Sequence, residues 1–359
     1  MKKIYYIAVV FAILFLAGCG DGIDLPGVNV ETDLNKIPLP DNNVNLEQVE
    51  LKPSTEPMLH EGLHTEEDFQ RIRDKKAAGE EPWVSAYQLL VESQFSQKTA
   101  DTYPTEWIKR GVSGDENYMN AARGATIVYQ QALRWKIEQD DEYAAKAVEN
   151  LNKWVQTCVG VTGNTNLSLA AGLYGYEFAI AGELLRDYGG WDRADFAAFQ
   201  NWLLKVFYPA NDDFLKRHHD TNALHYWANW CLCNIAAKMA IGIVTDRRDI
   251  YNEGIAHLQT GDTNGRLRRA IYHDYAPDYN FAQWQESGRD QGHTLMCVGL
   301  MGIICQLAWS QGDDFFAYDD NLFLRACEYA ACCNYTNETV PYTTYIWQKQ
   351  SQWGYPIPE

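Results

Sequence analysis

Residues 216–230 combine imidazole, amide and aromatic groups at the edge of an apolar helical segment. Asn222 and His225 are three residues apart, which would place them on one face of a helix capped by Thr221. A histidine near a helix start stays neutral, so it can form a hydrogen bond with a polar or anionic ligand. We therefore assign Asn222 and His225 to catalysis. A histidine that only satisfies a backbone carbonyl is the simpler alternative. The same stretch supplies two candidates for substrate contact: His218 and Trp227.

A second polar stretch, residues 283–294, leads directly into the apolar run 295–307. Polar side chains at the mouth of a buried helix are costly unless they face a wet cavity. Arg289 and His293 are four residues apart, so one helix edge can present both, and we assign them to the reactive site. Glu286 stands three residues before Arg289, and a structural clamp between these two is the alternative. Three residues here are candidates for substrate contact: Gln283, Gln285 and Glu286.

Between these stretches lies an aromatic loop, residues 272–279, which supplies tyrosine hydroxyls. Fixed positive charge stabilises a phenolate and lowers the pKa of a tyrosine, and three arginines stand just before the loop: Arg266, Arg268 and Arg269. Such a tyrosine can act as both base and acid near neutral pH. We expect Tyr279 to be the catalytic tyrosine, with Tyr275 as the second choice and as a substrate contact.

These groups fit β-elimination at a uronic acid. The C5 proton is only weakly acidic until the neighbouring carboxylate is neutralised, and amide, imidazole and guanidinium donors can supply that neutralisation. A tyrosine or histidine then removes the C5 proton, and a tyrosine or water protonates the leaving oxygen. The predicted set needs neither a metal nor another cofactor and consists of Asn222, His225, Tyr279, Arg289 and His293.

Two other functions remain open from the residues alone. A glycoside hydrolase would need two carboxylates across a groove, and Asp220, Glu286 and Asp290 could supply them. A non-catalytic glycan-binding lipoprotein would use the many aromatic rings, since the chain contains 12 Trp and 22 Tyr. The binding protein would not need the Asn, His and Arg groups described above.

The apolar spacing elsewhere is helical and recurs in pairs separated by short polar turns. The predicted pairs are 119–138 with 143–155, 167–187 with 194–207, 221–243 with 249–259, and 289–311 with 320–335. We therefore predict an all-α fold, an α/α toroid forming an incomplete barrel of antiparallel helical hairpins. Such a toroid carries a groove at one end, lined by loops and helix termini. A solenoid of stacked repeats is the competing architecture, but the sequence lacks the consensus spacing that repeats would show.

Residues from about 60 to 310 resemble the alginate lyase-like superfamily of polysaccharide lyases. The resemblance is carried by four segments: 144–154, 166–176, the stretch with Asn222 and His225, and Glu286 to His293. The last segment is similar to the branch that includes glucuronan lyases. The resemblance implies an α/α toroid that cleaves glucuronan or an alginate-like polymer, with an Asn and a His on the carboxylate, a Tyr as base and acid, and an Arg nearby. It also implies that Asn166 lines the groove.

Two positions depart from the family pattern. Asn222 and His225 are not adjacent, and Met296 stands where a tyrosine is expected two helical turns after the arginine.

The first residues have the features of an export signal. Lys2 and Lys3 precede an apolar run that ends at the lipobox-like sequence Leu-Ala-Gly-Cys, with Cys19 last. We predict a lipoprotein signal peptide over 1–18, lipidation of Cys19, a flexible tether over 19–57 and a lyase domain over 58–359. The protein would then be exported to the periplasm or the outer membrane and cell surface, and its lipid would be its only contact with a membrane.

The chain is acidic, with Lys+Arg 30 against Asp+Glu 48 and a net charge of −18. This balance argues against a nucleic acid partner, because phosphate contacts need a basic face. An anionic uronic-acid polysaccharide instead requires a local positive groove, for which we expect six residues: Lys216, Arg217, Arg266, Arg268, Arg269 and Arg289. Eight cysteines follow Cys19 and lie mostly in apolar helical runs, so we expect buried free thiols and no zinc site.

Overall fold

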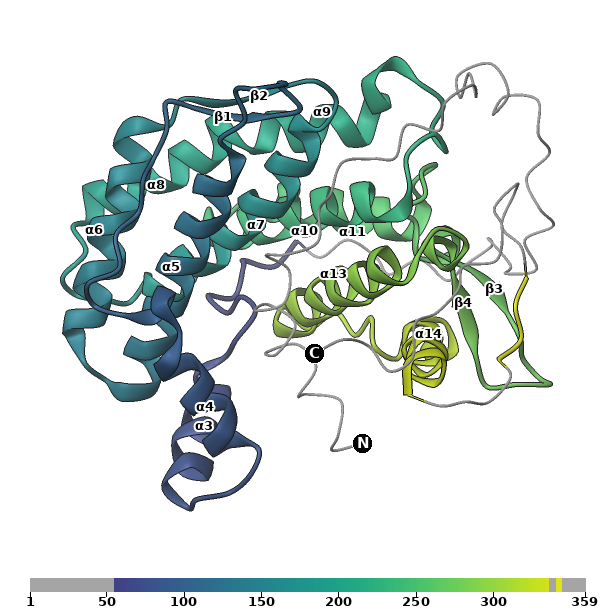
Figure 1. The fold of residues 1–359 in the computed structure, drawn as a ribbon, viewed down its shortest axis with the longest axis horizontal. Coiled ribbons are helices and arrows are strands. Elements are labelled where there is room, and N and C mark those ends of the chain that lie inside the picture. The colour runs from purple at the N-terminus through teal and green to yellow at the C-terminus, as the bar shows by residue number, and fades with distance from the viewer. Residues whose placement is uncertain (1–54, 336–339, 344–359) are drawn as a thin grey trace.

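The computed structural model describes residues 55–335 and 340–343. The predicted signal peptide, Cys19 and the tether as far as residue 54 lie outside the described residues. Within the described part, the chain forms two layers of helices (Figure 1). The inner layer consists of α5 (Tyr118–Glu138), α7 (Leu167–Leu185), α10 (Ala228–Val244) and α13 (Gln291–Ser310).

Each inner helix is followed in the chain by an outer one. The outer helices are α6 (Asp141–Thr157), α8 (Arg193–Val206), α11 (Arg248–Thr260) and α14 (Tyr318–Tyr335). Successive inner helices pack side by side in the order α5, α7, α10, α13. The prediction of an all-α toroid built from antiparallel helical hairpins is confirmed.

The division into layers follows from the composition of each helix. Outer helix α6 is amphipathic and buries one face, including Ala147, Leu151 and Trp154. Inner helices α7 and α10 are buried almost all round. Gly172 lets these two helices approach closely, since a Cβ there would lie only 2.5 Å from the Cys233 sulfur.

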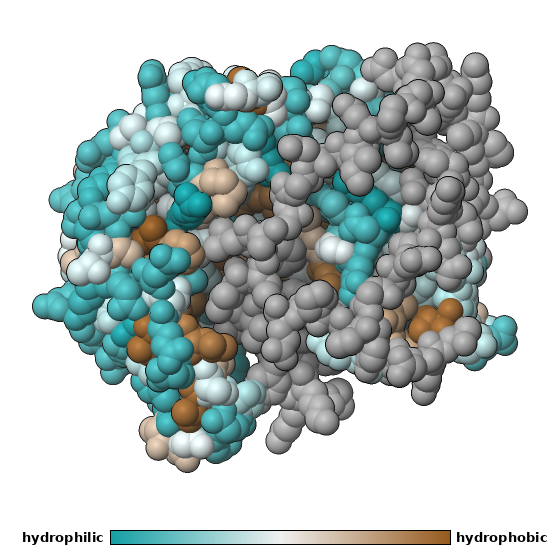
Figure 2. Space-filling view, viewed as in Figure 1, coloured by the Kyte–Doolittle hydropathy of each residue, from teal (hydrophilic) through white to brown (hydrophobic). Residues whose placement is uncertain are grey.

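Several shorter elements complete the described chain. The short helices are α3 (Glu66–Ala77), α4 (Trp83–Glu92), η3 (Gln94–Ser96), α9 (Tyr208–Arg217), η4 (His218–Asp220), α12 (Leu267–Ala270) and η5 (Gln285–Gly288). Two small sheets, which the sequence did not predict, pair β1 (Trp107–Arg110) with β2 (Gly160–Gly163) in parallel and β3 (Ile271–Asp274) with β4 (Ala282–Trp284) in antiparallel register. The described surface is mostly hydrophilic, with apolar residues gathered around α3 and α4 (Figure 2).

The N-termini of the four inner helices lie at the same end of the toroid. The β1–β2 pair joins the segments that lead into α5 and α7. Ser168, in the first turn of α7, contacts His219 just before α10. Gln285, just before α13, contacts the first residue of α10. The polar loops that the sequence singled out therefore meet at this end.

Residues 59–61 and the helix C-termini form the opposite end. The Gln311 side chain, after α13, donates hydrogen bonds to the carbonyls of Leu59 and Glu61. Arg186, after α7, donates to the carbonyl of Val244 at the end of α10. All eight described cysteines are free thiols and five of them are buried, as expected. Helix α13 is long and apolar enough to cross a membrane, but most of it is buried inside the toroid.

The third predicted hairpin begins later than expected. Helix α10 starts at Ala228, and residues 221–227 form a turn, so the prediction that Thr221 caps this helix is wrong. The first two amides of α10 are instead capped from the segment before α13. Ala228 N–H donates to Gln285 Oε1 at 2.9 Å, and Asn229 N–H donates to Glu286 Oε1 at 3.1 Å.

Candidate active site

The turn 221–227 carries Asn222 and His225. Asn222 is exposed, and its Oδ1 accepts the Leu224 N–H at 2.8 Å. The N–H of His225 donates to the Asn222 carbonyl at 2.9 Å. The two residues are therefore held together by one tight turn, and not by a shared helix face.

Arg289 joins this turn to the second polar stretch. Its guanidinium carbon lies 5.6 Å from the centre of the Trp227 ring, a cation–π contact. Its Nη1 lies 3.6 Å from Glu286 Oε2, which is an ion pair beyond hydrogen-bond distance. Neither of these two atoms has a hydrogen-bond partner among the described residues. The structure thus brings Glu286 and Arg289 to Trp227, which belongs to the turn that carries Asn222 and His225.

Glu286 is not available to a substrate, contrary to its assignment as a substrate contact. Its exposed fraction is 0%, because it lies between α10 and α13. Burial raises the pKa of this carboxyl, and the charges of Arg289 and His293 oppose that rise. Glu286 therefore acts on a ligand only through its neighbours.

Asp290 orients His293, a role that the sequence did not predict. It is the N-cap of α13: Oδ1 accepts the His293 N–H at 2.8 Å, and Oδ2 lies 2.7 Å from His293 Nδ1. Burial would raise the pKa of Asp290, but the hydrogen bonds from His293 and the charges of His293 and Arg289 outweigh burial and lower it. An ionised Asp290 keeps a proton on Nδ1 of His293 and so fixes the orientation of the ring.

The start of α7 lies close to the segment that precedes the turn 221–227. Asn166 is the residue before α7, and its N–H donates to Asn164 Oδ1 at 2.9 Å. Two residues further on, Ser168 Oγ lies 3.0 Å from His219 Nε2. His219, which the sequence did not assign, thus links α7 to the turn before α10.

Tyr226 is a further residue of this turn whose contacts the sequence did not predict. Its ring is buried and contacts His219 at 5.8 Å and His225 at 4.9 Å between centroids. The only sequence signal for it was its position directly after His225.

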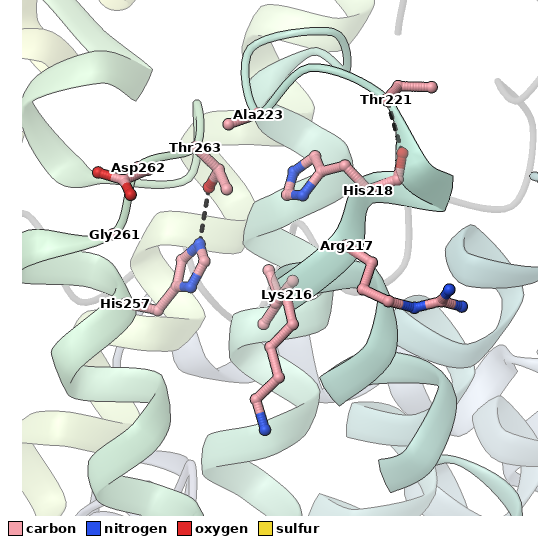
Figure 3. Close-up of a pocket in the computed structure, with 10 residues that line it drawn as sticks. Lys216, Arg217, His218, Thr221, Ala223, His257, Gly261, Asp262 and Thr263 are labelled. Carbon is pink, nitrogen blue, oxygen red and sulfur yellow. Dashed lines mark hydrogen bonds between the residues drawn. The ribbon is translucent and has the colours of Figure 1, made fainter.

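His218 points inward and does not offer a substrate contact, contrary to prediction. Residues 218–220 have positive φ values of 48°, 52° and 59°, so adjacent side chains diverge. His218 is 2% exposed, its Nε2 lies 3.4 Å from Cys231 Sγ, and burial lowers its pKa to about 4. The side chain lines a pocket of about 280 Å³ together with His257 and Thr263 (Figure 3). His218 therefore anchors the back of the turn.

Three residues that the sequence assigned to substrate contact form hydrogen bonds within the protein: Gln283, Gln285 and Tyr275. Gln283 is buried; its Nε2 donates to Ser287 Oγ at 2.8 Å, and its Oε1 accepts the Tyr275 hydroxyl at 2.5 Å. The Tyr275 hydroxyl oxygen also lies 3.0 Å from Thr343 Oγ1, within hydrogen-bond distance. Burial raises the pKa of Tyr275, the opposite of the shift expected from the neighbouring arginines. Gln285 caps α10, as described above.

Tyr279 is the more accessible tyrosine of this loop. It lies between β3 and β4 with 50% of its surface exposed, and its ring stacks on Phe281. The backbone N–H of Tyr279 donates to the Tyr275 carbonyl at 3.0 Å, and this hydrogen bond holds Tyr279 in the loop between β3 and β4.

The expected positive groove is reduced by carboxylate partners. Lys216 pairs with Asp212, Arg217 with Asp213 and Asp220, and Arg268 with Asp319. These pairings involve three of the six residues that were expected to form the positive groove. Arg289, with its two longer ion pairs, differs from them.

An α/α toroid whose loop end gathers amide, imidazole and guanidinium groups has the features of a polysaccharide lyase. Residues 72–338 match the sequence model of the alginate lyase family. The chain therefore belongs to the alginate lyase family and is a polysaccharide lyase.

Solved structures of alginate lyases share the fold. Alginate lyase A1-III from Sphingomonas species A1 has a TM-score of 0.54 at 13% identity, covering 77% of this chain and 80% of that one. A variant of A1-III complexed with a tetrasaccharide has a TM-score of 0.60 at 12% identity, covering 77% and 78%. An alginate lyase from Bacteroides ovatus has a TM-score of 0.51 at 14% identity, covering 75% and 82%. A search of curated proteins found no match.

Proposed function

We propose that this lyase cleaves a uronic-acid polysaccharide, glucuronan or an alginate-like polymer, by β-elimination at the loop end of the toroid. The observation that carries the proposal is the placement of the Arg289 side chain, which is 23% exposed and lies over Trp227 in the turn that carries Asn222 and His225. The tetrasaccharide bound to a related alginate lyase supports a polymeric sugar substrate.

The proposed reaction assigns one task to each group. Arg289, Asn222 and His225 neutralise the substrate carboxylate, so that negative charge can develop on it as the C5–H bond breaks. Tyr279 takes the C5 proton, the C4–C5 double bond forms, and the C4–O bond breaks. The glycosidic oxygen leaves with a proton from the tyrosine. His293, oriented by Asp290, contacts the same sugar, and Asn166 contacts the polymer on the α7 side.

The same site does not favour hydrolysis. Of the three carboxylates that a hydrolase could use, Glu286 is buried beside Arg289, Asp290 is bonded to His293, and Asp220 pairs with Arg217. No pair of them is left to act as acid and base across a groove.

The activity is tested with purified protein and four polymers: glucuronan, alginate, hyaluronan and pectin. We expect one of them to yield products with the ultraviolet absorbance of an unsaturated uronate. New reducing ends without that absorbance, or no turnover on any uronate polymer, would contradict the proposal.

The choice of tyrosine is tested by a matched pair of variants. Tyr279→Phe should lower kcat by about 10²- to 10⁴-fold, the range for loss of a general acid–base. Tyr275→Phe should retain kcat, because the Tyr275 hydroxyl already serves Gln283 and Thr343. If Tyr275→Phe is the inactive variant, the base is assigned to the wrong residue.

We further propose that the protein is an exported lipoprotein anchored through Cys19. The lipobox-like sequence and its basic and apolar flank support this assignment. Fractionation and mass spectrometry of the mature N-terminus should find a diacylated Cys19, and Cys19→Ala should release the protein from membranes. An unmodified mature protein that lacks Cys19 would refute the anchor.

A further inference from the structure

The carboxylate of Glu286 is buried at the junction of the two loops that form the site. It contacts the start of α10 through Asn229 N–H and faces Arg289 with its other oxygen. The remaining titratable groups around it are His293, Asp290 and two buried thiols, Cys231 on α10 and Cys297 on α13. Arg289 is therefore the nearest permanent positive charge to this buried carboxylate.

We propose that Glu286 is a positioning residue that ties Arg289 to the N-terminus of α10 and so holds the guanidinium against Trp227, in the turn that carries Asn222 and His225. The inference rests on the proposed function, because it gives Glu286 its role through the substrate carboxylate that Arg289 would bind. Glu286 itself does not touch the polymer.

The geometry explains how Glu286 can orient Arg289 without consuming its donors. An ion pair at 3.6 Å supplies attraction in a buried setting without a direct hydrogen bond to Nη1. The Trp227 ring fixes the guanidinium from a second direction, and Asp290 attracts Nε at 3.8 Å from a third. The guanidinium is thereby held by three weak contacts, and the Arg289 side chain stays 23% exposed for an incoming carboxylate.

Glu286 and its neighbour Gln285 provide a matched experiment. Both side chains cap an amide of α10, but only Glu286 faces Arg289. Glu286→Gln keeps an acceptor for Asn229 N–H and removes the charge beside Arg289. Gln285→Ala removes a cap and leaves that charge in place.

The kinetics of both variants are measured on the polymer that the wild type cleaves, together with their melting temperatures. We expect Glu286→Gln to lose at least tenfold in kcat with little change in melting temperature, and Glu286→Asp to recover part of that loss. Gln285→Ala should lower the melting temperature and keep kcat within about threefold, as expected for loss of a helix cap.

The inference is overturned if Glu286→Gln retains wild-type kcat, or if both variants lose activity only in proportion to their loss of folded protein. Failure of the proposed function gives a different result: the wild type itself then forms no unsaturated product. The proposed role of Glu286 is then refuted together with the proposed function.

Discussion

Two Glu-x-x-Arg sequences lie at opposite ends of the inner helices and have very different surroundings. At the end of α7, Arg186 Nε lies 3.0 Å from both oxygens of Glu183, and Nη2 lies 2.8 Å from one of them. Arg186 also bonds to the carbonyls of Ile243 and Val244 and to Asp246, and it is 7% exposed. Before α13, Arg289 makes ion pairs of 3.6 and 3.8 Å and a cation–π contact with Trp227, and its side chain is 23% exposed.

The difference separates an arginine that locks structure from one that can bind a ligand. Arg186 uses its N–H donors in hydrogen bonds within the protein and links α7 to the end of α10, so its removal should lower the stability of the fold. Arg289 is oriented by charge and by an aromatic ring, so its removal should weaken the binding of an anionic substrate. Identical spacing in the sequence does not distinguish the two roles, because spacing carries no information about partners that come from other helices.

The largest expected effect comes from removing each arginine in turn. Arg289→Ala should lower kcat/KM by about 10²- to 10³-fold, as for loss of one preorganised charge-stabilising group. Arg186→Ala should instead lower the free energy of unfolding by about 3–5 kcal/mol, because it leaves Glu183 buried without its partner. Steady-state kinetics and chemical denaturation of both variants check the comparison. If the two variants lost the same free energy of unfolding and had the same specific activity, the comparison between the two arginines would be contradicted.

Glu177 extends the comparison, because this half-buried glutamate forms no ion pair with an arginine among the described residues. Its Oε2 is buried without a hydrogen bond, and burial raises the pKa of Glu177 to about 8. The folded pKa exceeds the unfolded one, so ionisation opposes folding: stability falls as the pH rises from the unfolded pKa to about 8 and is then level.

Glu177→Gln should therefore gain stability over the wild type as the pH rises. We expect a gain of about 1–3 kcal/mol above pH 8, the usual cost of an unsatisfied buried polar group, and little difference in acid. Melting temperatures of both proteins across this pH range provide the measurement. A difference in melting temperature between the two proteins that stays constant with pH would contradict the raised pKa of Glu177.

Asp290 gives the smallest expected effect, because it is the more exposed of the two carboxylates near Arg289. Asp290→Ala removes the N-cap of α13 and should cost about 1 kcal/mol of stability. The folded pKa of Asp290 is lowered, so its contribution is present above the unfolded pKa and is lost as the pH falls through the folded one.

Asp290→Asn is the companion variant, because it keeps an acceptor for the cap and removes the charge. It should reduce kcat less than Glu286→Gln does, since solvent screens the more distant pair with Arg289. A larger loss for Asp290→Asn would reverse the ranking of the two carboxylates.

Periodicity in the sequence was sufficient to predict the toroid and three of its four hairpins closely. The start of α10 was not predictable, because its caps come from Gln285 and Glu286, 57 residues away in the chain. Local sequence offered Thr221 for that role, and its hydroxyl donates instead to the His218 carbonyl.

The two clusters of polar residues were also recognisable, but the role of each member depended on burial. His218 and His219 are adjacent, and the left-handed backbone of η4 sends one into the core and the other to α7. Gln283 and Glu286 look like ligand-binding residues in the sequence, yet both are buried and serve neighbouring protein groups. Periodicity cannot reveal such long-range hydrogen bonds.

The most direct test of the account is a crystal structure of the Tyr279→Phe variant with a uronate tetrasaccharide. We predict a substrate carboxylate within about 2.7–3.2 Å of the Arg289 guanidinium, the usual hydrogen-bond range, and next to the turn that carries Asn222 and His225. Glu286 should remain buried against Asn229. An oligosaccharide bound elsewhere, with Arg289 directed only at Glu286 and Asp290, would contradict the central claim.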